Sequence, residues 1–96
     1  MEIKSIMPDN PPIWRNFRFP NSHRHEIFFG TSNRKLSIKD GLIIYLTPEM
    51  HNGSKEGIHQ NHEFDMYAKR FAERVWLDYY NKTIDDFIER YGINVL

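Results

Sequence analysis

Residues 23–46 read HRHEIFFGTSNRKLSIKDGLIIYL, and this stretch decides the fold. From Arg24 onward, His25, Ile27 and Phe29 alternate with Glu26 and Phe28 until Gly30, a pattern typical of a short strand. The run from Leu42 to Leu46 is almost wholly apolar and follows an Asp-Gly turn signal. The sequence therefore predicts two strands of a β-hairpin that enclose a polar, basic loop over residues 31–39.

Three helices are expected after the hairpin. Thr47 precedes Pro-Glu, which predicts a short helix that ends before Gly53. Apolar side chains then recur at three- and four-residue spacing, which indicates an amphipathic helix over residues 63–80. Thr83 begins a capping-box-like pattern for a last helix over residues 83–91. The polar face of the long helix is interpreted as scaffold and carries Asp65, Lys69, Arg70, Glu73 and Arg74.

The N-terminal part of the chain is expected to be an irregular arm. Residues 8–20 contain four of the five prolines, which remove backbone donors and disfavour helix and central strand. Trp14, Phe17 and Phe19 are expected to anchor this arm on the core. The alternative is that these aromatic rings, beside Arg15, stack on nucleic-acid bases.

Length and composition indicate one globular α+β domain. The 96 residues suffice for one modest core, and 40% hydrophobic and 15% aromatic residues exclude a disordered chain. We divide the domain into an arm (1–22), a hairpin core (23–62) and C-terminal helices (63–96). No apolar run approaches the roughly 20 residues of a membrane span, and no signal peptide is apparent. A location in the cytoplasm of a bacterial host cell is the expectation, with no membrane partner.

The formal net charge is zero, but the charges are unevenly placed. Between Pro12 and Lys39 a single acid, Glu26, stands against six bases, so this half of the chain could face the phosphates of DNA. A polarised but merely solvated surface is the alternative. The six basic residues are Arg15, Arg18, Arg24, Arg34, Lys35 and Lys39.

Histidine is the residue type that points to chemistry. With no cysteine there can be no disulfide and no thiolate zinc cluster, so a metal ion would need imidazole, carboxylate or amide ligands. The histidines lie in the middle of the chain, on the predicted strand, at the predicted short helix and in the glycine-containing loop after it. They are His23, His25, His51, His59 and His62.

The ordered set of these elements resembles the short HNH-like proteins of bacteriophages and prophages. The resemblance extends over roughly residues 25–96 and includes a C-terminal FIERYG motif followed by Asn94. The earlier matching pieces are His25 to Gly30, Asn33-Arg34, Ser37, Gly41-Leu42, His51 and Gly57-Ile58-His59.

The resemblance implies a ββα-metal core that grips one divalent cation against a scissile phosphate. It implies His25, His51 and His59 as metal ligands and Asn33 as the middle asparagine. The ion would be magnesium, manganese, zinc or nickel. Hydrolysis would be aided by a base that takes a proton from water.

Two features depart from the family pattern. Many relatives carry cysteine pairs that bind a structural zinc, which the aromatic arm would replace here by packing on the hairpin. The position after the first ligand, usually a general-base histidine, is Glu26. An ordinary glutamate, with a pKa of about 4.3, is a weaker base at neutral pH than histidine. In a competing register His25 is the base and His23 the ligand, because side chains two apart share a strand face.

Three functions from different classes follow. The first is an HNH-like DNA endonuclease or nickase with little sequence readout, since no recognition helix is apparent. The second is a catalytically weakened HNH-derived module that binds DNA or inhibits a host protein. The third is a structural metalloprotein, against which three ligands rather than four argue, because structural zinc usually has four. The sequence does not determine an oligomeric state.

Overall fold

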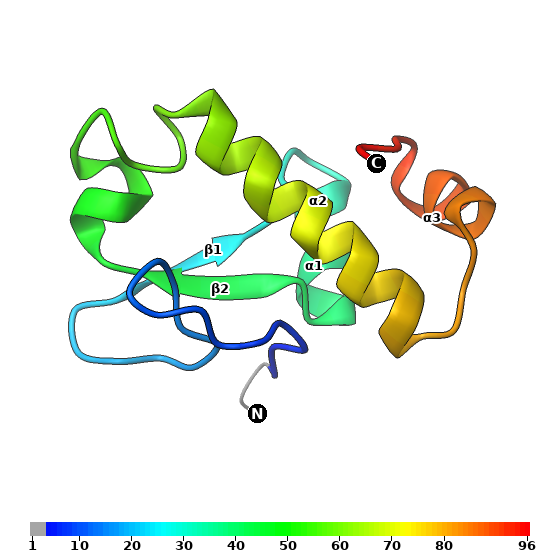
Figure 1. Ribbon diagram of the computed structural model, residues 1–96, viewed down its shortest axis with the longest axis horizontal. Coiled ribbons are helices and arrows are strands. Elements are labelled where there is room, and N and C mark those ends of the chain that lie inside the picture. The colour runs from blue at the N-terminus through cyan, green and yellow to red at the C-terminus, as the bar shows by residue number, and fades with distance from the viewer. Residues whose placement is uncertain (1–3) are drawn as a thin grey trace.

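The hairpin is the centre of the fold. The structure is a computed structural model that describes residues 4–96, and in it β1 (His23–Glu26) pairs antiparallel with β2 (Ile43–Leu46). Helices flank both ends of this two-stranded sheet, which is a small α+β arrangement (Figure 1). The predicted strand pair is thus confirmed, although β1 ends at Glu26 and does not continue to Phe29.

The connection between the strands is a helix, so the prediction of a loop over residues 31–39 was wrong. Helix α1 spans Asn33–Asp40. Ser37, which makes the stretch look polar, is buried, and its hydroxyl accepts from the Phe28 N–H and donates to the Phe28 carbonyl. Gly41 ends the helix with a φ of 82°, and a Cβ there would lie 2.8 Å from the Lys4 carbonyl oxygen. Tertiary contacts thus stabilise a helix that lacks an apolar stripe.

The short helix expected after β2 is a single π-helical turn, η1 (Glu49–Gly53). Thr47 has the predicted capping role, since its Oγ1 accepts from the Met50 N–H at 3.2 Å. The backbone then turns back on itself, because the Ile58 N–H donates to the Met50 carbonyl at 2.7 Å. Single π-turns occur often at functional sites, and this one carries His51.

The two C-terminal helices agree with the predictions to within a residue or two. Helix α2 spans His62–Tyr79 and helix α3 spans Ile84–Tyr91. Thr83 and Asp86 form the expected capping box, with the hydroxyl and the carboxylate each accepting from the other residue's backbone N–H. No helix in the described part of the chain has the length and apolar character needed to cross a membrane.

Glu73 departs from the polar face assigned to α2. Its side chain is fully buried, and Oε1 accepts from the Val95 N–H at 2.9 Å. Burial raises the pKa of this carboxyl, while the hydrogen bond from Val95 and the charge of Arg74 act in the opposite direction. Glu73 therefore holds the C-terminal segment against α2.

The N-terminal arm is irregular, as predicted, but only part of its aromatic set is buried. Trp14 is 1% exposed, and its indole N–H donates to the Pro8 carbonyl at 2.9 Å. Phe17 is 45% exposed, so the expectation that it anchors the arm was wrong. The Arg15 guanidinium lies over its ring instead, 4.4 Å from the centroid. Phe19 is half-buried.

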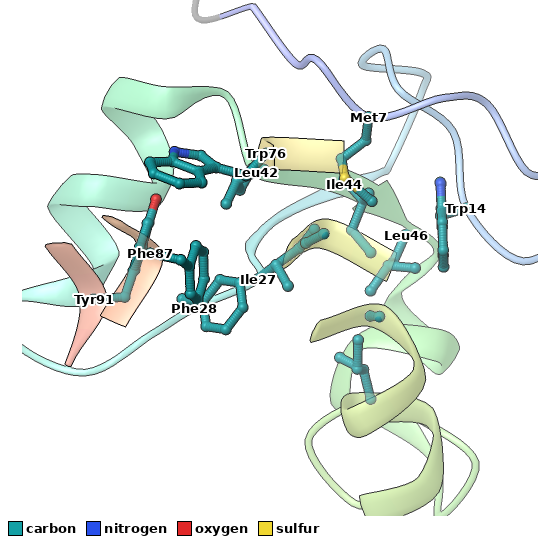
Figure 2. Packing of buried hydrophobic residues seen from close by; sticks show 13 residues of the cluster. Met7, Trp14, Ile27, Phe28, Leu42, Ile44, Leu46, Trp76, Phe87 and Tyr91 are labelled. Atoms are coloured by element: carbon teal, nitrogen blue, oxygen red, sulfur yellow. The ribbon is translucent and has the colours of Figure 1, made fainter. Parts of the chain in front are cut away.

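One hydrophobic cluster joins the arm, the hairpin and the helices. In Figure 2, side chains of the hairpin such as Ile44 occupy the middle, Trp14 lies at one end, and Trp76 and Tyr91 lie at the other. Phe87 stacks on Tyr91 with ring centroids 4.5 Å apart. The arm and α3 are therefore held by the same core.

Asp40, the last residue of α1, accepts hydrogen bonds from several side chains near α3. Its carboxylate accepts from the indole N–H of Trp76 at 2.9 Å and the hydroxyl of Tyr91 at 2.8 Å. Arg90 donates to both carboxylate oxygens, at 2.6 and 2.7 Å. The Asp40 backbone carbonyl accepts from the Tyr80 hydroxyl. One carboxylate thus links three helices.

Replacing Asp40 with asparagine is expected to destabilise the fold. The substitution leaves the Arg90 guanidinium beside a neutral amide, and because Arg90 is one-third exposed we expect a loss of about 2–3 kcal/mol in unfolding free energy. Asp9→Asn, which removes the exposed pair with Arg15, should cost less than about 1 kcal/mol. Urea unfolding of the two variants measures the difference. Equal losses would mean that the Asp40 network does not hold the helices.

Candidate metal centre

Three imidazole rings meet beside β1, on the side of the hairpin where η1 and the loop before α2 lie. His25 comes from β1, His51 from η1 and His59 from the loop before α2. Each offers one nitrogen, and these nitrogens all lie within 4.8 Å of one another. The structure therefore brings together the three residues that the sequence predicted as ligands, close enough to bind one metal ion.

Local geometry fixes the three rings. The antiparallel register pairs His25 with Ile44, whose side chain belongs to the core, so the alternation of the strand turns His25 inward. The backbone N–H of His59 donates to the backbone carbonyl of His51 at 3.1 Å, which holds these two residues together. Gly57 permits this close turn, because a Cβ there would lie 2.9 Å from the Glu49 carbonyl oxygen.

The nitrogen atoms suit a cation. His25 is 2% exposed, and its Nε2 atom is buried with no hydrogen-bond partner. The Nε2 atoms of His51 and His59 lie 3.1 Å apart. Two nitrogens that bind one zinc ion at about 2.0–2.1 Å with tetrahedral geometry are about 3.4 Å apart, close to this value. A cation at this position would satisfy the buried Nε2 of His25.

Burial and neighbouring charges favour the neutral, metal-binding form of His25 and His51. Burial lowers the pKa of His25 from its ordinary 6.5 to about 3, and positive charge at His59, His51 and Lys69 adds to the effect. Burial also lowers the pKa of His51, as do His59 and His23, while Glu26 acts in the opposite direction. Neutral imidazole is the form that binds metals. Because the pKa of each ring is lowered, protons compete only weakly with a metal ion for His25 and His51.

Lys69 and Phe29 form a rim beside the rings, and the sequence analysis missed both. The Phe29 ring centroid lies 5.4 Å from that of His59 and 5.8 Å from that of His25. The Lys69 ammonium lies over Phe29, 4.4 Å from its centroid, and pairs with Asp65 at 2.9 Å. The four-residue spacing of Asp65 and Lys69 was visible, but it is typical of any solvated helix face.

Glu26 and Asn33 have other partners. Glu26 pairs with the guanidinium groups of Arg24 at 3.0 Å and Arg34 at 3.4 Å. Asn33 begins α1, and its amide donates to the Tyr91 carbonyl at 3.1 Å. The side chain of Asn33 thus joins α1 to α3.

The six predicted phosphate-binding residues are also placed by the structure. Arg15 pairs with Asp9 at 2.9 Å, and Arg18 lies over the ring of Tyr45. Lys35 and Lys39 are exposed on α1. Arg24 and Arg34 meet at Glu26, so three of the six bases are paired with acids within the described residues.

Comparisons of the chain with models of known protein families, with curated proteins and with solved structures found no match. A function must therefore be inferred from the residues and the geometry of the site.

Removal of one imidazole should weaken metal binding. We expect His25→Ala, His51→Ala and His59→Ala each to reduce zinc or nickel affinity by more than about 100-fold, beyond the 10–100-fold typical of outer-shell changes. His62→Ala is the control, because His62 is exposed at the start of α2 and is not part of the group. Titration calorimetry of the metal-stripped chain measures the affinities. Unchanged affinity in the three variants would show that the ion does not bind here.

The metal-free protein should lose stability in acid because of His25. Between about pH 6.5 and pH 3 the unfolded chain binds a proton at His25 that the folded chain does not, so the unfolding free energy falls as the pH falls. We expect His25 to contribute a loss of about 2 kcal/mol at pH 5 relative to pH 7.5. Urea unfolding with a chelator present measures it. His25→Gln, which cannot titrate, should show a shallower pH dependence, and parallel curves would contradict the assignment.

Proposed function

We propose that this chain is a metal-dependent HNH-like DNA endonuclease or nickase. The observation that carries the proposal is the buried, unpartnered Nε2 of His25 beside the close Nε2 pair of His51 and His59. Antiparallel strands followed by a helical turn that carries a ligand are consistent with the ββα layout that the sequence resembles. In this interpretation α1 is an insertion between the two strands.

The ligand set suits a catalytic ion better than a structural one. His25, His51 and His59 would hold the ion, and three protein ligands leave a position open for substrate. Imidazole nitrogen favours zinc or nickel over magnesium, which prefers carboxylate and water oxygen. A bound divalent ion supplies charge stabilisation at the phosphate and the leaving oxygen.

Lys69 would add a second positive charge for the substrate. Its ammonium lies at the rim of the site and lowers the pKa of His25 through its charge, so it is within electrostatic reach of the rings. A phosphodiester beside the ion would therefore meet a cation on the α2 side. The exposed ring of Phe29 forms the surface between Lys69 and the imidazoles.

Glu26 remains the candidate for the water-activating base. Without DNA, the guanidinium groups of Arg24 and Arg34 pair with its carboxylate. Both are among the bases proposed to contact DNA, and a phosphate that binds them would compete with Glu26. The base would then be released when DNA binds. In the competing register His25 is the base and His23 the ligand, but the group of imidazoles close enough to hold one ion contains His25 and not His23.

One observation favours the second candidate function, a module that binds DNA or a host protein without cutting. The carboxylate that stands where a histidine base is usual is already paired with two arginines. If this pairing persists on DNA, the chain would keep the ion and the fold but lack the base.

The direct test is cleavage of supercoiled plasmid by the metal-stripped chain with added magnesium, manganese, zinc or nickel. We expect nicked or linear product with at least one of the four ions, and none with His51→Ala, because that variant lacks a ligand. Gel electrophoresis measures the products.

Two further variants separate chemistry from metal binding. Glu26→Gln should reduce cleavage by at least about 100-fold and leave metal affinity unchanged, as expected for loss of a general base. Lys69→Gln should reduce cleavage, whereas Lys55→Gln, a change at an exposed lysine in the loop after η1, should not. If no ion supports cleavage by the unmodified chain or by Glu26→His, the enzyme proposal fails and the binding module takes its place.

A further inference from the structure

His51 uses both ring nitrogens, and each faces another histidine. Its Nε2 lies 3.1 Å from Nε2 of His59, inside the metal centre. Its Nδ1 lies 3.1 Å from Nδ1 of His23, and the His23 and His51 rings meet edge to face at 88°. His23 is the first residue of β1, two positions before His25, so strand alternation directs both side chains to the same face. Its nitrogens are nevertheless not among those that converge on the proposed ion position.

The proton count of imidazole makes this contact directional. A neutral ring carries one N–H, and an ion binds the nitrogen that has no proton. If Nε2 of His51 faces the ion, its proton must be on Nδ1, which then donates to Nδ1 of His23. His23 must accept at Nδ1 and so carry its own proton on Nε2. With an ion on Nε2 of His51, the contact with His23 is compatible only with this arrangement of protons.

From this geometry we infer that His23 is a positioning residue for the metal centre, which accepts a hydrogen bond from His51 and thereby fixes the tautomer and ring orientation of that ligand. The inference rests on the proposed metal site and not on hydrolysis. Metal-bound histidines commonly donate their second N–H to a carboxylate, a carbonyl or water. In this chain a second imidazole would take that place, which also explains why the competing assignment of His23 as a ligand does not fit.

The surroundings of His23 make the role testable without damage to the core. The residue is exposed, and it lines an open cavity of about 590 Å³ between the turn at residues 19–22 and residues 47–49. Asparagine can place its Oδ1 near the position of Nδ1 and accept the same hydrogen bond, whereas alanine cannot. His23→Asn and His23→Ala therefore form a matched pair.

We expect His23→Ala to weaken zinc binding by 10–100-fold and His23→Asn to retain affinity within a few fold. Zinc titration of the full chain with a competing chelator measures both, and thermal unfolding without metal should be the same for the two variants. Nitrogen-15 NMR of the zinc-loaded chain should show the His51 proton on Nδ1. That readout separates a positioning role from a general structural one.

The inference is overturned if His23→Ala binds zinc as tightly as the unmodified chain, if His23→Asn is as weak as His23→Ala, or if the His51 proton is on Nε2. Failure of the unmodified chain to bind zinc would overturn the metal site and this inference together. Zinc binding with the expected behaviour of the pair, but no plasmid cleavage, would reject the nuclease alone.

Discussion

The Asp40 carboxylate is the group on which the helical part of the structure depends. A buried charge is costly unless it is paired, and this one receives hydrogen bonds from Trp76, Arg90 and Tyr91, which lie on two helices other than its own. Because Asp40 ends α1 just before β2, the same network also fixes the hairpin relative to α2 and α3. Figure 1 shows α1 and α3 at one end of the hairpin and the turn of η1 at the other.

The Asp40 cluster and the histidine cluster differ in how their buried polar groups are satisfied. In the Asp40 cluster, both carboxylate oxygens accept from donors, so the cluster is complete within the chain. In the histidine cluster, Nε2 of His25 has no partner within the described residues, and burial lowers the pKa of that ring to about 3. A satisfied cluster contributes to stability, whereas an unsatisfied one is expected where something else binds. Oδ1 of Asp65 and Oε2 of Glu73 also lack partners, but Nε2 of His25 lies in a group of three imidazoles close enough to bind one ion. This grouping identifies the histidine cluster as the candidate site.

The sequence was informative where local patterns and the final structure agree. Helix α3 has its capping box at Thr83, and α2 has its apolar stripe, so both were predicted. Helix α1 was missed because its stability comes from burial of Ser37 and the turn at Gly41, contacts that no local pattern contains. The three histidines were predicted as a set, from their order and a family resemblance. The place of Lys69 beside the rings and the contact of His23 with His51 depend on how β1, η1 and α2 pack, which residue spacing does not determine.

The difference between the two clusters also bears on the type of metal site. Structural zinc is most needed in small domains that lack a sufficient core. Here one hydrophobic cluster reaches from Met7 to Tyr91, and the Asp40 network links three helices, so the fold has other sources of stability. Burial of His25 as a neutral ring without a partner instead reduces stability, because a buried polar atom goes unsatisfied. A buried ligand atom without a partner, beside two further imidazoles, is therefore better explained by metal binding than by a contribution to the fold.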